Sequence, residues 1–379
     1  NVRSALVFDV GSLYTRVGLV SEQQVCTFSS HVAPKVMRAT HKNLGEFKES
    51  QQKRKEQWQE EVPLLVQEDI GNEQTFRTPM NSNFLVDCEA LEYLIQGVYS
   101  ELSLSPLESP VIFLTSTLMP LENKAKIMEI MFEKLGVPAL YTESSALMSL
   151  LSQNVNTGLV VESGDSGTLV VPIINCVPIE SACKMYPIAG NHITQQMLRT
   201  LLEKPVNEGI TLPMARSLKH QYANLSQCDI GNHCKIGYIQ QGGYTRNVEL
   251  GRDSLRCAEQ LFQSVQCVQD QASPQGLQHI ILDAVTRATK THETRQTLFH
   301  NVLPCGGNTQ LQGFDERLVK ELNNLGAQAK VIQSNGENQR SNMATRGGMI
   351  FSLLPQVRDQ YFTKQMYEEV GTQYPISIE

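Results

Sequence analysis

Length, composition and charge limit what this chain can be. Its 379 residues, 41% hydrophobic and 19% charged, exceed what one hydrophobic core usually organises, so we expect two domains. The formal charge is −7, from 32 lysine and arginine residues against 39 aspartate and glutamate residues. This balance disfavours a protein that coats nucleic acid, although it leaves direct nucleic-acid contact through a local basic patch open. Apolar runs all fall short of the roughly 18 residues that a membrane-spanning helix needs, so we predict no membrane partner.

Nine cysteines are scattered without a repeating spacing. An odd number in a chain of this size indicates reduced thiols in the cytosol or nucleus. The tightest group of potential metal ligands is Cys228, His233 and Cys234, with His220 upstream. Adjacent His and Cys without a second Cys-x-x-Cys arm match no common zinc spacing. Thiols in loops and core are therefore the preferred interpretation, and a metal site is the alternative.

The first predicted element is a β-hairpin. An apolar run at 5–8 ends in Asp9, and a second β-prone run at 15–20 follows a turn that contains Gly11. Two such runs joined by a short glycine-containing turn are typical of a hairpin. The later segment 34–61 is rich in Lys, Glu and Gln and carries both signs of charge. It predicts a solvated loop or helix, with contact to a partner as the alternative.

Further elements alternate along the rest of the chain. The patterns predict strands at 111–114 and 279–282 and helices at 88–102, 121–135, 144–153, 193–203 and 344–354. Pro120 near the start and Gly136 just after the end delimit the second of these helices. Helices and strands in alternation indicate an α/β protein.

The hairpin design recurs in the second half of the chain. A strand-like run at 158–161 leads to Glu162, a glycine-rich turn follows at 163–167, and a second run at 168–173 returns. In both copies an acidic residue ends the first strand and glycine makes the turn. The chain therefore carries a duplicated unit, one copy in each half. A third glycine turn, at 304–309, follows another short apolar run.

Glycine turns of this kind suit phosphate groups. Gly and Ser leave successive backbone N–H groups pointing one way, and such a concavity binds phosphate oxygens without a side-chain cation. An acidic residue at the adjoining strand end can hold a hydrated Mg2+, because Mg2+ prefers oxygen ligands and keeps several waters. Two such hairpins facing one another would clamp a nucleotide triphosphate between two lobes. Gly306 and Gly307 in the third turn would let the backbone approach a base or sugar.

Taken together, these segments resemble the actin family. Residues 7–12 resemble its first phosphate loop, 162–165 its second, Gly190 the glycine beside the sugar and 306–309 the adenosine loop. The resemblance covers nearly the whole chain apart from about 34–77, and it includes the stretches 130–133, 251–263, 346–350 and 363–369. It implies an α/β protein with the actin-like ATPase fold, in which duplicated ribonuclease-H-like domains form two lobes around a nucleotide cleft.

The resemblance also implies the extent of each lobe. The first lobe would comprise 1–152 and 343–379, with a charged insertion at about 32–77. The second lobe would comprise 153–342, with an outer subdomain at about 189–272.

The nucleotide-binding residues follow from the same resemblance. They are Asp9, Gly11, Ser12, Leu13, Arg16, Glu162, Gly164, Asp165, Ser166, Gly190, Lys219, Gly306, Gly307 and Asn308. Asp9 and Asp165 would hold Mg2+ through water, and Arg16 replaces the family's phosphate-contacting lysine. Around the adenine the match fails, since the family's glutamate, Met-Tyr pair and lysine are replaced by His220, Gln310, Leu311 and Ser341. We expect ATP or ADP with Mg2+ as a structural ligand, with a cleft free of nucleotide as the alternative.

Three departures from the family bear on hydrolysis. Ser145 stands where the family has the glutamine that orients the attacking water, and Leu169 replaces a histidine that assists it. Glu162 replaces an aspartate and is one methylene longer. Without a positioned water, in-line attack loses an orientation contribution of several kcal/mol. We therefore predict no catalytic residues and negligible ATP hydrolysis.

The resemblance suggests a role without filaments. Conventional actin polymerises through an apolar-tipped loop, and the charged segment 34–61 stands in its place. Family members that neither hydrolyse nor polymerise usually serve as rigid subunits of larger assemblies. Two stretches, 188–194 and 307–314, are similar to the nuclear class found in chromatin remodellers and histone acetyltransferases. A nuclear structural subunit is thus the first hypothesis, and a cytoplasmic, cytoskeletal actin-related protein of the dynactin or branching-complex type is the alternative. An active phosphotransferase is a third.

In the nuclear class a helix from a scaffold or motor subunit lies across the base of the cleft. The corresponding groove would be lined by Leu151, Asn154, Asn156, Ile350, Phe351, Leu354 and Gln356. Core packing is the alternative for Ile350 and Phe351. Actin or another actin-related protein is a further expected partner.

Overall fold

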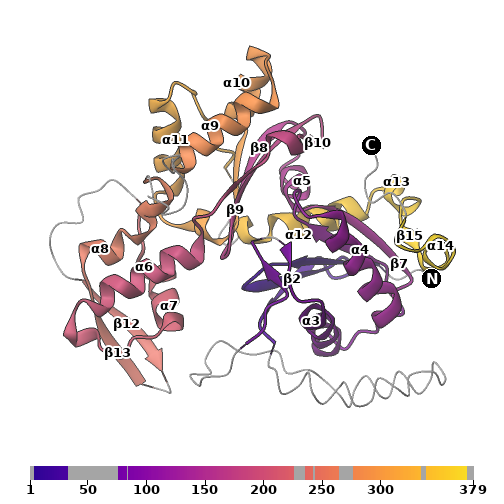
Figure 1. Ribbon diagram of the computed structural model, residues 1–379, viewed down its shortest axis with the longest axis horizontal. Coiled ribbons are helices and arrows are strands. Elements are labelled where there is room, and N and C mark those ends of the chain that lie inside the picture. Colours follow the sequence, from indigo (N-terminus) through magenta and orange to yellow (C-terminus); the bar gives the residue numbers. More distant parts are fainter. Residues whose placement is uncertain are drawn as a thin grey trace. The chain divides into compact units, whose positions relative to one another are not determined.

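The computed structural model describes residues 4–32, 76–82, 84–225, 235–241, 244–263, 276–333 and 339–373. It divides into two compact units (Figure 1), the first comprising Asn1–Ser152 and Asn342–Glu379, the second Gln153–Ser341. The segment 34–61 and the candidate metal ligands Cys228, His233 and Cys234 lie outside the described residues. Within the described ranges, no group of three His, Cys, Asp or Glu side chains is placed to hold a metal ion. No helix in those ranges is long and apolar enough to cross a membrane.

A six-stranded sheet forms the centre of the first unit, in the order β15-β7-β6-β1-β2-β3. Its strands are β1 (Leu6–Val10), β2 (Tyr14–Leu19), β3 (Gln24–Ser29), β6 (Val111–Thr115), β7 (Ala139–Ser144) and β15 (Phe362–Thr363). β1 and β2 pair antiparallel, with Leu6 opposite Leu19, which confirms the predicted hairpin. β1, β6 and β7 run parallel, so their carboxyl ends meet at one edge of the sheet.

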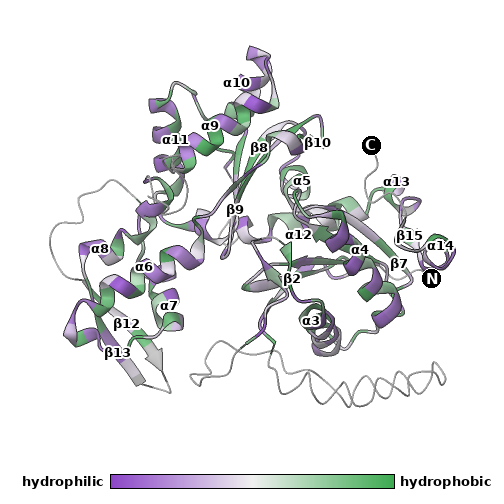
Figure 2. Cartoon of the chain, viewed as in Figure 1, coloured by the Kyte–Doolittle hydropathy of each residue, from purple (hydrophilic) through white to green (hydrophobic). Residues whose placement is uncertain are grey.

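Helices pack around this sheet, and most combine apolar and polar residues (Figure 2). They are α3 (Cys88–Glu101), α4 (Leu121–Glu129), the π-helix η2 (Ile130–Leu135), α5 (Ser145–Leu151), α12 (Gln339–Ser352), α13 (Pro355–Arg358), α14 (Lys364–Val370) and the short 3-10 turn η7 (Gly371–Gln373). A small hairpin of β4 (Met80–Asn81) and β5 (Phe84–Leu85) precedes α3. Asp87 and Ser144 cap α3 and α5 by accepting hydrogen bonds from main-chain N–H groups, as side-chain caps commonly do.

The second unit repeats this plan. Its main sheet has the order β10-β9-β8-β14, with β11 also paired to β9. The strands are β8 (Gly158–Ser163), β9 (Thr168–Ile174), β10 (Val177–Pro178), β11 (Lys184–Tyr186) and β14 (Val302–Cys305). β8 and β9 form the second predicted hairpin. β14 runs parallel to β8, and Val331 bridges β14 in parallel on its other side. An antiparallel hairpin continued by parallel neighbours is therefore common to both units.

The remaining elements of the second unit are helical apart from one two-stranded ribbon. The ribbon consists of β12 (Lys235–Gln241) and β13 (Tyr244–Leu250). The helices are α6 (Gly190–Leu202), α7 (Leu212–Tyr222), α8 (Arg252–Leu255), α9 (Leu277–Ala288), α10 (His292–His300) and α11 (Phe314–Asn324). The 3-10 turns are η3 (Glu180–Ala182), η4 (Pro205–Asn207), η5 (Cys257–Leu261) and η6 (Gly307–Gln310).

One predicted strand is wrong. Residues 279–282 belong to helix α9, in which Leu277, Ile281, Ala284 and Val285 are buried. These positions follow the i, i+4, i+7, i+8 spacing of one helical face. A run of four apolar residues does not distinguish a strand from a turn of a buried helix. The predicted helix at 121–135 is helical throughout but changes from α4 to the π-helix η2 at Ile130.

Each unit has its own hydrophobic core. In the first, Phe8, Phe113 and Phe132 are buried among the residues of β1, β6 and η2. In the second, Val161 and Phe314 belong to a separate cluster built on β8, α9 and α11. Burying large aromatic and aliphatic side chains in this way is the main source of folding free energy.

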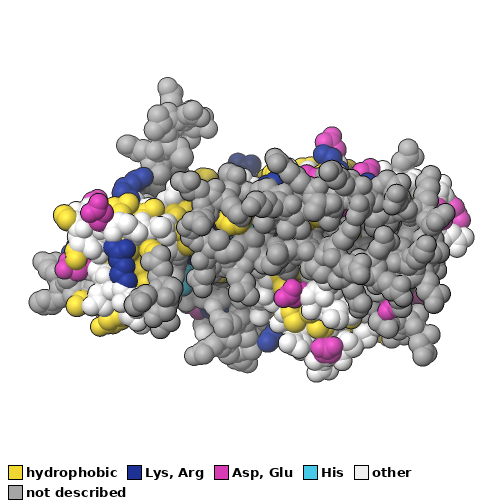
Figure 3. All heavy atoms as spheres, turned by 90° about the horizontal axis from the view of Figure 1, so that it is seen from below, with side chains coloured by type: hydrophobic (Ala, Val, Ile, Leu, Met, Phe, Trp, Pro, Cys, Tyr) yellow, Lys and Arg dark blue, Asp and Glu magenta, His cyan; other side chains and the backbone are white. Residues whose placement is uncertain are grey.

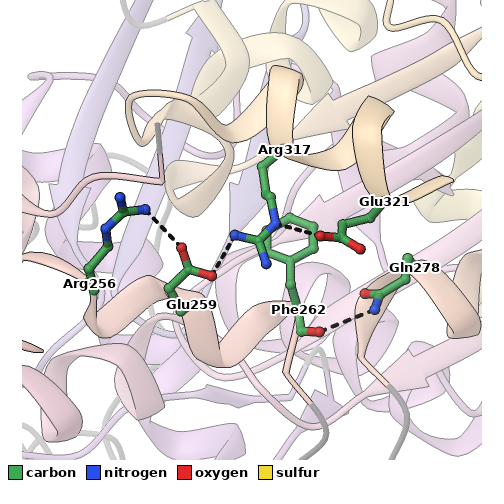
Figure 4. A network of polar contacts seen from close by, with 6 residues as sticks. All are labelled: Arg256, Glu259, Phe262, Gln278, Arg317 and Glu321. Atoms are coloured by element: carbon green, nitrogen blue, oxygen red, sulfur yellow. Dashed lines mark hydrogen bonds and ion pairs between the residues drawn. The ribbon is translucent and has the colours of Figure 1, made fainter. Parts of the chain in front are cut away.

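A network of charged side chains fastens helix α11 to the 3-10 turn η5 in the second unit (Figure 4). Arg317 donates to Glu259 at 2.6 Å and to Glu321 at 2.8 Å, and Arg256 donates to Glu259 at 3.0 Å. The Arg317 guanidinium also lies 5.2 Å from the centre of the Phe262 ring. The side chains of Arg317 and Glu259 are only 17% and 15% exposed, so solvent screens this pair weakly.

Replacing Arg317 with alanine is expected to lower the free energy of unfolding by about 2–3 kcal/mol, because Glu259 loses a partner in a poorly solvated place. Arg287→Ala is the matched control. Its ion pair with Asp283 lies on one exposed helix face and is worth at most about 0.5 kcal/mol. Urea unfolding of both variants measures the difference, and equal losses would contradict this account of the network.

Candidate nucleotide-binding site

The turn between β1 and β2 is held by main-chain hydrogen bonds. Gly11 N–H donates to Tyr14 O at 3.0 Å. A Cβ on Gly11 would lie 2.8 Å from that same oxygen, so the turn requires glycine there. Behind it, Ser12 O accepts from the Thr78 hydroxyl at 2.9 Å, and Leu13 is buried. The first predicted phosphate loop is thus a tight turn at the carboxyl end of β1.

Asp9 and Arg16 lie opposite each other on β1 and β2. Burial raises the pKa of the Asp9 carboxyl, and the charge of Arg16 and the nearby Thr345 hydroxyl oppose that effect. Arg16 Nε donates to Asn342 Oδ1 at 3.2 Å. An acidic and a basic side chain therefore sit together beside the turn, and α12 orients the basic one.

The carboxyl ends of β6 and β7 contribute hydroxyl groups to the same edge of this sheet. Thr117 Oγ1 and Ser144 Oγ are hydrogen-bonded at 2.7 Å, and both are buried. Ser145 follows as the half-buried first residue of α5. Glu143, which the sequence did not single out, accepts from Ser144 N–H at 2.7 Å, and burial raises its pKa. The sequence signal that could have identified Glu143 is its position, because it is an acidic residue at the end of strand β7.

The turn between β8 and β9 is closed by Gly164 N–H, which donates to Gly167 O at 3.0 Å. Beneath it, Ser163 Oγ and Thr168 Oγ1 are hydrogen-bonded at 2.8 Å. Glu162 is half-buried and lies opposite Leu169 in the ladder. Both of these departures from the family pattern therefore stand side by side at the end of this hairpin.

The third glycine turn lies next to the second. β8 and β14 are parallel neighbours, with Cys305 opposite Glu162, so the turns that follow them emerge at the same sheet edge. Gly306 has φ +88° and ψ 168°, a backbone region that essentially only glycine adopts. A Cβ on Gly306 would lie 2.4 Å from Ser163 O, whereas one on Gly307 would meet nothing within 4 Å.

Gly190 begins α6 and is bonded directly to the second turn. Its N–H donates to Gly164 O at 2.9 Å, and Asn191 N–H donates to Asp165 O at 2.8 Å. Lys219 on α7 is 2% exposed, and its ammonium donates to Gly190 O at 3.1 Å. Gly164, Gly190, Lys219 and Gly306 are thus brought together within one unit.

Two observations test whether these residues fit a phosphate group and a hydrated metal ion. Asp165 Oδ1 is buried and has no hydrogen-bond partner in the described chain, which leaves an acceptor for a hydrated cation. Burial lowers the pKa of Lys219 to about 8, against the charge of Asp165, so an added anion would stabilise its charged form. The residues fit both groups. Asp9 and Asp165 belong to different units, and their sharing of one Mg2+ stays a prediction.

The depressed pKa of Lys219 predicts proton-coupled binding. Below pH 8 the free lysine is protonated, and above it the proton is lost, whereas a bound phosphate would raise the pKa again. The complex therefore holds more protons, and ATP affinity is expected to fall as the pH rises through 8. Titration calorimetry at pH 8 in two buffers of different ionisation enthalpy should detect proton uptake. Lys219→Met should abolish it, and an affinity unchanged from pH 7 to 9.5 would contradict this assignment.

The predicted groove residues are divided between the units. Leu151, Ile350, Phe351, Leu354 and Gln356 belong to the first, and Asn154 and Asn156 are exposed in the second. Ile350 and Leu354 are 52% and 44% exposed, and Leu353, which the sequence analysis missed, is 60% exposed. Phe351 packs on Tyr141 with ring centres 5.4 Å apart. The last turn of α12 and the two residues that follow the helix thus present apolar side chains to solvent, next to an aromatic pair.

Two units, each with an antiparallel hairpin, parallel neighbouring strands and a glycine turn at the carboxyl end of the first strand, define the actin-like ATPase fold. A family model described as Actin matches residues 1–223 and 237–376. The chain belongs to the actin family.

Proposed function

We propose that this chain is a non-polymerising actin-related protein that serves as a structural subunit of a nuclear chromatin-remodelling or histone-acetyltransferase complex. The observation that carries the proposal is the exposed apolar end of α12. Ile350 lies in the last turn of α12, and Leu353 and Leu354 follow directly after the helix ends at Ser352. All three are at least 44% exposed. Large apolar side chains exposed together mark sites for protein partners, and an apolar surface of this kind suits the apolar face of a helix from a scaffold or motor subunit.

Nucleotide has a structural role in this proposal. The glycine turns, the buried Oδ1 of Asp165 and the buried Lys219 support binding of ATP or ADP with Mg2+. A bound Mg2+ would supply charge neutralisation of the phosphates. The protein's own contribution is to orient them through main-chain N–H groups. Binding that favours the folded state stabilises it by mass action.

Hydrolysis is proposed to be negligible. Leu169 is fully buried hydrocarbon and has no group that can bind water, and Ser145 has a side chain too short to replace a glutamine amide. We expect phosphate release at least about 100-fold slower than from a member with both residues, because water orientation contributes several kcal/mol. Steady-state phosphate release measures this. Ser145→Gln should raise the rate, and rapid release by the unmodified protein would favour the phosphotransferase hypothesis.

The proposed partners are proteins, namely a scaffold or motor helix and actin or another actin-related protein. The described residues on the face in Figure 3 include basic, acidic and apolar side chains. The net charge of −7 supports protein contacts over a nucleic-acid surface. Affinity purification from nuclear extract, with the co-purifying chains identified, tests the proposal. Motor-adaptor partners in cytoplasm, or filaments that sediment under polymerising salt, would favour the cytoskeletal alternative.

A further inference from the structure

Asn308 joins the adenosine turn to the phosphate turn of the second unit. Its side chain is 4% exposed. Its Nδ2 donates to Gly164 O at 2.6 Å and to Ser163 Oγ at 3.1 Å. These residues lie 144 and 145 positions away in the sequence. Two segments remote in the chain are thereby tied by one amide group.

This amide fixes the direction of a peptide group. Gly164 O accepts from Asn308 Nδ2 at 2.6 Å and from Gly190 N–H at 2.9 Å, and a carbonyl oxygen has two lone pairs. Because a trans peptide is planar, its carbonyl and the following N–H point to opposite sides. Turning Gly164 C=O toward Asn308 and α6 therefore turns Asp165 N–H the other way.

The peptide between Asp165 and Ser166 has the same orientation, with its carbonyl toward α6. Asp165 O accepts from Asn191 N–H at 2.8 Å, so the N–H of Ser166 also points away from α6. Two successive N–H groups that point to one side form the concavity that binds an anion. The first N–H groups of α6 donate hydrogen bonds to the carbonyl groups of the β8–β9 turn. These bonds therefore orient the turn before any ligand binds.

Steric fit keeps the amide in place. A Cβ on Gly190 would lie 2.9 Å from Asn308 Oδ1 and 3.2 Å from Asp165 Cα. Asn308 therefore packs against a glycine on one side and the phosphate turn on the other, and a larger residue at 190 would push them apart.

We propose that Asn308 is a positioning residue, whose side-chain amide holds the Gly164–Asp165 peptide in the phosphate-binding orientation in the absence of nucleotide. The inference rests on the proposed nucleotide binding for its functional part. It assigns Asn308 a contact with the protein's own phosphate turn, which determines how well that turn receives a triphosphate.

The test compares Asn308→Leu with Asn301→Leu. Leucine has nearly the shape of asparagine but has no donor and adds no charge. Asn301 makes the same kind of bond at the opposite end of β8, where its Nδ2 donates to Thr157 O at 2.8 Å. The control thus removes one amide-to-carbonyl bond in the same unit without reaching the turn.

Hydrogen–deuterium exchange of the nucleotide-free proteins is the first measurement. Asn308→Leu should speed exchange at Gly190 and Asn191 at least about tenfold, because their acceptors are released, while amides later in α6 keep their protection. Asn301→Leu should leave Gly190 and Asn191 unchanged. If exchange at these two amides is unaltered in Asn308→Leu, or if α6 loses protection throughout, the proposal is overturned.

Calorimetric titration with ATP and with adenosine is the second measurement. Asn308→Leu should lower ATP affinity at least about tenfold more than adenosine affinity, since a misoriented turn affects only phosphate groups. Equal losses for both ligands would indicate general damage and overturn the positioning role. If the unmodified protein binds neither ligand, nucleotide binding itself fails as a function, and the exchange result still decides whether Asn308 fixes the turn.

Discussion

Gly306→Ala is expected to destabilise the second unit by at least about 3 kcal/mol, because alanine fits neither the backbone conformation nor the space at this position. The φ of +88° with ψ of 168° costs a non-glycine residue about 1–3 kcal/mol. The new Cβ would also lie 2.4 Å from Ser163 O and 2.9 Å from Ser163 C. Those are main-chain atoms at the end of β8 and cannot move aside as a flexible side chain would.

Gly307→Ala is the matched control, since a Cβ there meets nothing within 4 Å. It should change the free energy of unfolding by less than about 1 kcal/mol. Urea unfolding of both variants provides the comparison, and ATP titration should show that Gly306→Ala also loses binding. Similar small effects at both positions would mean that the third turn does not depend on the close approach to β8.

The two hairpins could be predicted from the sequence because their signals are local. Alternating β-prone runs, an acidic residue and a glycine turn lie within about fifteen residues in each copy, and the ladders pair Leu6 with Leu19 and Glu162 with Leu169 as the turns require. The order of the strands in each sheet, by contrast, depends on contacts between residues that are distant in sequence. The parallel pairing of β14 with β8 joins residues far apart in sequence, and no local pattern specifies it.

The glycines and charged residues of the site were predictable, but the bonds among them were not. A motif names Gly164 and Asn308 without showing that an amide from one bonds to the carbonyl of the other. Likewise, Arg340 was not predicted, although it forms ion pairs with Asp315 at 2.5 Å and donates to Thr309 O at 2.6 Å. Such contacts depend on tertiary packing, which leaves no periodic pattern in the sequence.

Burial affects one charged group in each unit in the same way. Burial raises the pKa of Asp9 and lowers that of Lys219 to about 8, so in both units desolvation disfavours the charged form. A metal ion beside the carboxylate and a phosphate beside the ammonium would each relieve this cost. Within the protein, Arg16 partly offsets this cost for Asp9, and Asp165 partly offsets it for Lys219.

The double variant Ile350→Asp/Leu353→Asp is expected to weaken binding of the partner helix at least about 100-fold, because it removes two apolar anchors and introduces two charges that would be buried in the complex. Both side chains are more than half exposed in the chain itself. The free energy of unfolding should therefore change by less than about 0.5 kcal/mol per substitution. Quantified co-purification from nuclear extract, followed by titration of the identified partner, measures the loss.

Val86→Asp is the matched control, because Val86 lies in the same unit, is 59% exposed and precedes α3. It places one aspartate, against two in the double variant, at an apolar surface position away from α12 and should retain the partner. If Val86→Asp releases the partner as strongly as the double variant, the loss reflects added charge and not the loss of apolar contacts at the end of α12. If neither variant releases it, the partner docks elsewhere and the exposed Ile350, Leu353 and Leu354 no longer support the proposed function.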